Sequence, residues 1–346
     1  PSLRGRAYPC AMAAGAAKRR VRHAAAILRR VKRGVVESTR LTLEVRELKE
    51  AVRGLREDLG SESQVSRPTS HLGRLEATQA LVARTYEAGF RWDEQVRAMR
   101  LEEGYEAPWE ESEPLISVRV ATYDNAKVLV ERALASVLRQ TYTNWEAVVV
   151  GDACTDDTAE RVAALGDPRI RFENLPFRGP YPRDETAFWH VAGAPPMNRG
   201  LELARGAWIA AIDHDDEWDD DHLEVLLDEA RRTRAELVYA GWRMVDDERG
   251  RMIDHRFGGV YPPVDGAIAF QTTLCHGGLV RFRLDMNAYL AGEPADRNLG
   301  RRLWDAGVRF AVLERPVTTY WFSPRSAWGR EYLDRIRATY GYVDDA

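Results

Sequence analysis

The stretch AWIAAIDHDDEWDDD, residues 207–221, joins a short apolar run directly to seven carboxylates within nine positions. The apolar run has the length and composition of a buried β-strand, and the acidic residues begin where that strand would end. Similar apolar runs recur from Leu115 onward, with helical patterns between them: LISVRVA, WEAVVVG, RIRFENL and ELVYAGW. This alternation predicts a sheet of mainly parallel strands with helices on both faces. Ligands of such sheets bind beyond the carboxyl ends of the strands, so the residues that follow each strand are the candidates for chemistry.

Asp213, Asp215 and Asp216 are candidate ligands for a divalent cation, because they stand at the end of the strand in 207–213. Neighbouring carboxylates repel one another, and Mg²⁺ or Mn²⁺ relieves this repulsion while it also binds phosphate oxygens. A cation held there would neutralise charge on a departing nucleoside diphosphate. We therefore predict that Asp213 and Asp215 hold the metal and that Asp216 belongs to the same site.

The remaining aspartates of the run, residues 219–221, have a different expected role. They precede a helical pattern, and Asp221 with Glu224 has the spacing of a capping box. We expect one of these aspartates to cap that helix.

A separate carboxylate, Asp152, follows the strand WEAVVVG. Thr155 or Asp156 is better placed to cap the helix that comes next, which leaves Asp152 available to hydrogen-bond a base or a ribose. Cys154 lies in the same loop and is expected to pack, since no neighbour in the sequence would activate its thiol. The loop 177–194, rich in aromatic residues and proline, is expected to contribute to the same site.

Four segments, in this order, resemble family 2 glycosyltransferases. They are SVRVATYD (117–124), SVLRQTYTNWEAVVVGDACTDDT (136–158), MNRGLELARGAWIAAIDHDDEW (197–218) and GEPADRNLGRRLWDAGVRFAVLERPVTTYW (292–321). The resemblance implies the α/β GT-A fold of nucleotide-diphospho-sugar transferases, a Rossmann-like mixed sheet between helices. It also implies a nucleotide-sugar donor, UDP- or GDP-linked, and Mn²⁺ or Mg²⁺ as the cofactor.

The resemblance also implies roles for single residues on the donor side. By similarity, Tyr123 packs on the nucleobase and Asp152 hydrogen-bonds it. Asp213 and Asp215 form the family's Asp-x-Asp pair, and Asp215 and Asp216 stand nearest the metal and the diphosphate.

On the acceptor side, Asp296 matches the family's general base, which removes the proton of a sugar hydroxyl as that hydroxyl attacks the anomeric carbon. One such base without a covalent intermediate implies inversion at that carbon. His276, in the segment TTLCHGGLVRF, stands at the usual acceptor-side position and is a candidate for binding the acceptor or the diphosphate.

The chain divides by pattern into four regions. Residues 1–36 hold ten Lys or Arg and no acid, so this basic arm is expected to contact anionic lipid headgroups, with nucleic acid as the alternative. Residues 37–113 are helical with a linker, 114–322 form the catalytic domain, and 323–346 are a C-terminal tail. The helical region contains a heptad stripe typical of a coiled coil, which would make a homo-oligomer, or of a single amphipathic helix: Leu41, Val45, Leu48, Val52, Leu55 and Leu59.

The sequence as a whole predicts an enzyme of the cytoplasm, with the basic arm on the inner face of the membrane. No apolar run reaches the roughly 18 residues needed to span a bilayer, and three widely spaced cysteines do not form a disulfide framework. We expect metal-dependent, inverting hexosyl transfer to a glycan or lipid-linked hydroxyl in cell-surface polysaccharide or glycolipid synthesis. The alternatives are a coiled-coil scaffold with a degenerate transferase domain, or a sugar nucleotidyltransferase. The latter is disfavoured because ATYDNAKVLV contains no glycine to cradle a triphosphate.

Overall fold

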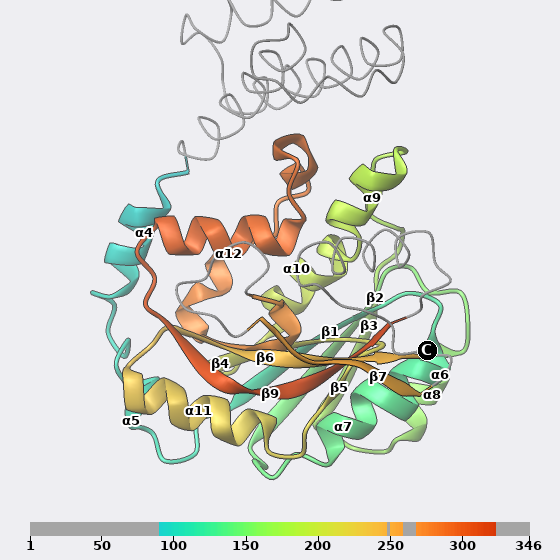
Figure 1. The fold of residues 1–346 in the computed structure, drawn as a ribbon, viewed down its shortest axis with the longest axis horizontal. Helices are drawn as coiled ribbons and strands as arrows, with labels where there is room; N and C mark the ends of the chain where they lie inside the picture. The colour runs from blue at the N-terminus through green and yellow to red at the C-terminus, as the bar shows by residue number, and fades with distance from the viewer. Residues whose placement is uncertain (1–89, 248–249, 259–267, 323–346) are drawn as a thin grey trace, which may run out of the picture. The chain divides into compact units, whose positions relative to one another are not determined.

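The computed structural model describes residues 90–247, 250–258 and 268–322 (Figure 1). The basic arm, the heptad stripe and the C-terminal tail lie outside these ranges, so membrane contact and a coiled coil stay predictions. None of the helices in the described ranges combines the length and the hydrophobicity that a membrane crossing requires.

The described chain divides into two compact units. The smaller unit contains residues 90–92, 182–191 and 287–294, and in it α9 (Glu185–Val191) contacts the 3₁₀-helix η4 (Ala288–Ala291). The larger unit contains the sheet and most of the remaining helices, together with all the residues discussed below as a candidate site.

The larger unit is built on one mixed sheet. In the described ranges its strand order is β3-β2-β1-β4-β8-β6-β9-β5, and β7 pairs with β6. The strands are β1 (Ile116–Thr122), β2 (Trp145–Gly151), β3 (Ile170–Asn174), β4 (Trp208–Asp213), β5 (Glu217–Trp218), β6 (Leu237–Asp246), β7 (Arg251–Gly258), β8 (Thr273–His276) and β9 (Phe310–Phe322). Strands β1 to β4 are parallel to their neighbours, β8 is antiparallel to both β4 and β6, and β6 and β9 are parallel again. The predicted mixed α/β sheet is therefore confirmed.

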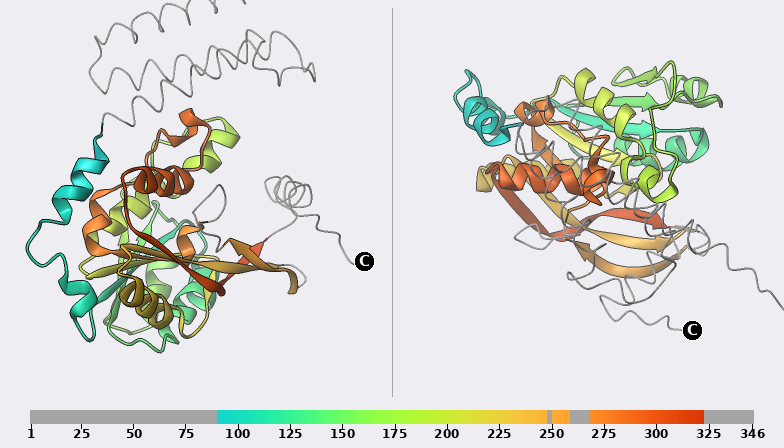
Figure 2. Two further views of the ribbon diagram at one scale, coloured as in Figure 1. Left: turned by 60° about the vertical axis from the view of Figure 1, so that its left-hand side comes forward. Right: turned by 90° about the horizontal axis from the view of Figure 1, so that it is seen from above.

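Helices cover both faces of this sheet, as Figures 1 and 2 show for the larger unit. One face carries α10 (Ala194–Leu203) and α12 (Ala295–Asp305). The other carries α6 (Ala126–Val128), the π-helix η1 (Leu129–Leu134), α7 (Ala135–Leu138), α8 (Thr158–Ala164) and α11 (His222–Thr233). The cover on both faces explains why every residue of β1 and β2 is buried.

Three parallel strands end together at one edge of the sheet. Thr122 at the end of β1 pairs with Gly151 at the end of β2, and Ala121 pairs with Asp213 at the end of β4. This register brings the residues that follow the three strands to one place. It is the feature of the fold that positions the candidate site.

A buried ion-pair cluster joins the segment before the sheet to the sheet itself. The carboxylate of Glu236, which is fully buried, accepts two hydrogen bonds of 2.7 Å from the guanidinium of Arg100. It also accepts a hydrogen bond from the hydroxyl of Tyr105 and one of 2.7 Å from the backbone N–H of Arg309. Burial, and then Glu236, raise the pKa of Tyr105 to about 12, so the phenol remains the donor.

We expect a Glu236→Ala substitution to lower the free energy of unfolding by about 3–5 kcal/mol, because it leaves Arg100 half-buried without its partner. Urea unfolding followed by circular dichroism would measure the loss. Glu131→Ala is the matched control, since its ion pair with Lys127 is exposed and should contribute less than about 1 kcal/mol. Similar losses in the two variants would contradict a structural role for the Glu236 cluster.

Candidate active site

The first part of the site lies at the ends of β1 and β2. Tyr123 follows β1 and is 39% exposed, whereas Asp152 follows β2 and is only 2% exposed. The carboxylate of Asp152 accepts hydrogen bonds from the Tyr181 hydroxyl at 2.7 Å and from the Gly179 backbone N–H at 3.3 Å. The guanidinium of Arg178 lies over the Tyr123 ring, 3.4 Å from its centroid, and its Nε is 3.4 Å from Asp152.

The second part is the acidic turn after β4. The backbone N–H of Asp216 donates to the carbonyl of Asp213 across this turn at 3.2 Å, which holds the intervening residues in a tight bend. The Nδ1 atom of His214 lies 3.3 Å from the Ala121 carbonyl oxygen. Asp216 is fully buried, and neither of its carboxylate oxygens has a hydrogen-bond partner among the described residues.

The protonation equilibria of these carboxyl groups are linked. Burial, and next the charge of Asp215, raise the pKa of Asp213 to about 6. Burial raises the pKa of Asp216 well above its ordinary value, and the charges of Asp215 and Asp213 add to the shift. Without a cation, the carboxyl groups of this turn therefore resist full ionisation. A bound cation would favour their ionised forms.

The third part is Asp296 in the first turn of α12. Burial raises the pKa of its carboxyl group, and its charge contributes to the raised pKa of Asp213. The buried Arg119, on β1, interacts electrostatically with both aspartates and lowers both pKa values. The carboxylates of Asp213 and Asp296 thus interact electrostatically with each other and with Arg119.

The residues of the acidic turn fit a divalent cation. Three carboxylates within four positions carry excess negative charge, and one of them is buried with both oxygens unpartnered. Mg²⁺ and Mn²⁺ use one or two protein carboxylates together with substrate phosphates, so the turn supplies a sufficient donor set.

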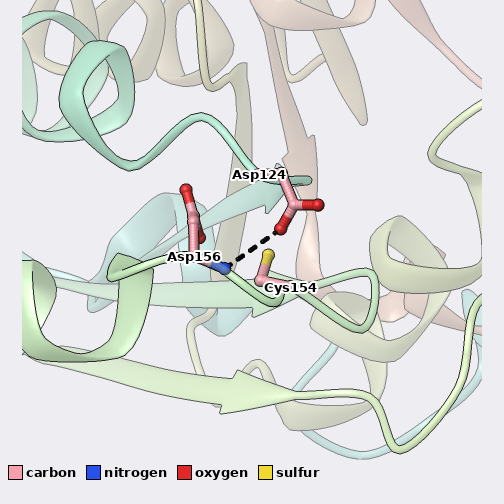
Figure 3. Close-up of side chains that lie close together, drawn as sticks. All are labelled: Asp124, Cys154 and Asp156. Atoms are coloured by element: carbon pink, nitrogen blue, oxygen red, sulfur yellow. Dashed lines mark hydrogen bonds between the residues drawn. The ribbon is translucent and has the colours of Figure 1, made fainter.

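A second acidic group lies nearby but fits a cation less well. The ligand atoms of Asp124, Cys154 and Asp156 lie within 4.8 Å of one another (Figure 3). Asp124 already accepts backbone N–H bonds from Thr155 at 2.7 Å and from Asp156 at 3.3 Å, and Asp156 accepts one from Ala126 at 3.1 Å. Burial raises the pKa of the Cys154 thiol, which disfavours the thiolate that a metal would need. The hydrogen bonds of this group join the loop that follows β1 to the loop that follows β2.

The structure places His276 away from the acidic turn. His276 pairs with Trp208 at the start of β4, whereas Asp213 is at the end of the same strand. Its Nδ1 accepts the Gly278 N–H at 3.0 Å, its Nε2 is 3.0 Å from the Tyr105 carbonyl, and its ring stacks on Trp109. Both ring nitrogens are occupied in a buried aromatic cluster, so this geometry gives no support to a role in acceptor or diphosphate binding.

The expected capping box at α11 does not form. Asp221 occupies the N-cap position without a side-chain hydrogen bond to the helix, and its carboxylate binds Arg315 instead. Glu224, the other member of the box, accepts a hydrogen bond from the Thr141 hydroxyl at 2.6 Å. A long-range ion pair of Asp221 and a long-range hydrogen bond of Glu224 thus replace the local cap.

A sequence match identifies the family of this domain. Residues 117–182 and 189–287 match the model of Glycosyl transferase family 2. The chain therefore contains a family 2 glycosyltransferase domain. The family and the GT-A fold expected from the resemblance are confirmed, and three of the four segments, 117–124, 136–158 and 197–218, lie within the matched ranges. The fourth segment, 292–321, lies outside them, so its resemblance stays a prediction.

Two curated relatives illustrate the match of this glycosyltransferase domain. The UDP-Glc:α-D-GlcNAc-diphosphoundecaprenol β-1,3-glucosyltransferase WfgD of Escherichia coli is 29% identical over 133 residues, which are 38% of this chain and 47% of that protein. The succinoglycan biosynthesis protein ExoO of Rhizobium meliloti (strain 1021) is 36% identical over 126 residues, 36% of this chain and 32% of that protein. The match spans less than half of the length of either relative. Among solved structures, the mannosyltransferase PcManGT from Pyrobaculum calidifontis, in complex with GDP-Man and Mn²⁺, aligns with a TM-score of 0.48 at 18% identity, over 76% of this chain and 72% of that one.

An Asp213→Asn substitution should stabilise the metal-free protein near neutral pH. The folded state binds the Asp213 proton more tightly than the unfolded state does, because the pKa is raised from 3.8 to about 6. The free energy of unfolding of the wild type therefore falls by on the order of 2–3 kcal/mol as the pH rises through that range. The variant does not undergo this fall. Urea unfolding in EDTA at about pH 7.5 should favour the variant, and the difference should shrink at about pH 4.5. A difference that does not change with pH would contradict the raised pKa.

Proposed function

We propose that this domain transfers a sugar from a UDP- or GDP-linked donor to a hydroxyl group of a glycan or lipid-linked acceptor. The observation that supports this most is that the carboxylates at the ends of β2 and β4 lie at one edge of the sheet, and that Asp296 in the first turn of α12 interacts electrostatically with Asp213. The sequence relatives point to polysaccharide synthesis, since one is named for succinoglycan biosynthesis and another for a lipid-linked acceptor with UDP-Glc as donor.

In this proposal, the donor lies across the carboxyl ends of β1, β2 and β4. Tyr123 packs on the base and Asp152 accepts a hydrogen bond from it. Asp213 and Asp215 hold Mn²⁺ or Mg²⁺, and Asp216 belongs to the same site and supplies further negative charge. When bound, the cation neutralises the charge that develops on the departing diphosphate.

Asp296 acts on the acceptor. Its carboxylate removes the proton of the acceptor hydroxyl as that oxygen forms a bond to the anomeric carbon and the bond from that carbon to the diphosphate breaks. Attack from the face opposite the leaving group inverts the configuration. The raised pKa of Asp296 suits this role, since a more basic carboxylate accepts the proton more readily.

A ligand screen with the full chain tests the proposal. UDP, GDP and their sugars would be added with Mn²⁺ or with EDTA, and the melting temperature and the release of free sugar would be followed. A ligand of the folded state raises the melting temperature, so we expect a shift with one nucleotide class that EDTA removes. No shift and no donor turnover with any nucleotide sugar would contradict the proposed function.

A further inference from the structure

The pocket expected to hold the nucleobase is already occupied by the chain's own residues. Arg178 covers the face of the Tyr123 ring at 3.4 Å, which is van der Waals contact. Tyr181 and Gly179 donate hydrogen bonds to the two carboxylate oxygens of Asp152. Both groups that would recognise a base are therefore engaged by one short segment, residues 177–181.

A base cannot enter this arrangement without displacing the segment. An aromatic ring stacked on the face of Tyr123 that Arg178 covers needs the space that the guanidinium fills, because the gap of 3.4 Å admits no second layer between the two groups. A base N–H that donates to Asp152 must also replace one of the present donors, since the carboxylate is 2% exposed. Binding of the base and the present position of the segment therefore exclude each other.

The segment is held in this position from both ends. At its start, the Leu175 N–H donates to the Gly151 carbonyl at 2.9 Å. At its end, the Gly193 N–H donates to the Tyr181 hydroxyl at 3.3 Å. Gly179 in the middle passes so close to Pro195 that a Cβ atom there would lie 2.3 Å from the proline Cγ.

We propose that Arg178, Gly179 and Tyr181 of this segment form an autoinhibitory latch, which takes the place of the nucleobase on Tyr123 and Asp152. This inference rests on the proposed function, because it assumes that those two residues bind the base of the donor. Donor binding then requires the latch to open, and the apparent affinity is reduced by the fraction of molecules in which it is closed. The latch keeps the donor site closed until a nucleotide displaces it.

Two variants open the latch in different ways. Arg178→Ala removes the cation from the Tyr123 face, and Gly179→Ala retains the cation but forces the segment away from Pro195. Gly179 has no positive φ, so the added methyl group acts through its close contacts, which are with Pro195 and, at 3.3 Å, with Cζ of Tyr181. Phe177→Ala is the matched control, since Phe177 is 75% exposed in the same segment.

The test is isothermal titration of UDP and GDP, with Mn²⁺, into the full-length wild type and these variants. The latch predicts that Arg178→Ala and Gly179→Ala bind the preferred nucleotide about tenfold more tightly, a change of about 1.4 kcal/mol. Phe177→Ala should bind as the wild type does. Melting temperatures without nucleotide would show that each variant is folded.

The other outcomes distinguish a failure of the latch from a failure of the proposed donor site. Weaker binding by Arg178→Ala would make Arg178 a ligand of the donor and overturn the latch, while the donor site would stand. Unchanged binding by both variants would also overturn the latch. Binding of neither nucleotide by any of the four proteins would overturn the donor site itself.

Discussion

An Asp296→Asn variant should transfer sugar about 10²–10⁴ times more slowly than the wild type, with little change in nucleotide affinity. The amide has the size of the carboxylate but cannot accept the proton of the acceptor hydroxyl. Asp296 lies in the first turn of α12 and is not one of the groups at the ends of β1 and β2 that are proposed to bind the base. The measurements are kcat at saturating donor and the dissociation constant of the nucleoside diphosphate.

The pH dependence gives a second test of the same residue. Only the ionised form of Asp296 is a base, and burial raises its pKa above the ordinary value. Activity should therefore fall as the pH drops through this raised pKa, at a higher pH than an exposed aspartate would give. Asp305→Asn, at the exposed far end of the same helix, is the control and should leave kcat unchanged. An Asp296→Asn variant within a few-fold of wild type would exclude Asp296 as the base.

Replacing Asp215 by alanine should lower donor turnover by about 10²–10³-fold and raise the Mn²⁺ concentration needed for half-maximal rate. Asp215 stands between Asp213 and the buried Asp216, so its loss removes a proposed metal ligand from the place where negative charge is concentrated. Initial rates measured across a Mn²⁺ series would show both effects.

Asp220→Ala is the matched control for this prediction. Asp220 belongs to the same acidic run, but its carboxylate pairs with Arg139 and its side chain is 62% exposed. We expect that variant to keep the wild-type rate and the wild-type Mn²⁺ dependence. Equal rates for Asp215→Ala and the wild type would refute the assignment of the metal site.

Much of the donor side could be predicted from the sequence, for a physical reason. Asp152 and Asp213 follow apolar runs that can only be buried strands, and parallel strands bring their carboxyl ends to one edge of the sheet. Local pattern and sheet geometry are enough to place these two residues together. The same reasoning could not indicate that β8 is antiparallel, and this direction places His276 at the opposite end of β4 from Asp213.

The contacts that the sequence could not indicate are long-range and involve side chains of loops. Arg178 and Tyr181 reach Asp152 across 26 and 29 residues, and nothing in their spacing marks them as its partners. Asp221 has ideal capping-box spacing, yet it pairs with Arg315, 94 residues away. A carboxylate can bind a distant guanidinium in place of a local N–H only when the fold brings that guanidinium near.

The most direct test of the proposed donor site is a crystal structure of the full chain with UDP or GDP and Mn²⁺. We expect the cation within coordination distance of Asp215, the diphosphate on that cation, and the base stacked on Tyr123 with Arg178 displaced. A cation held by Asp124, Cys154 and Asp156, or a nucleotide bound away from Asp152 and Asp215, would contradict it.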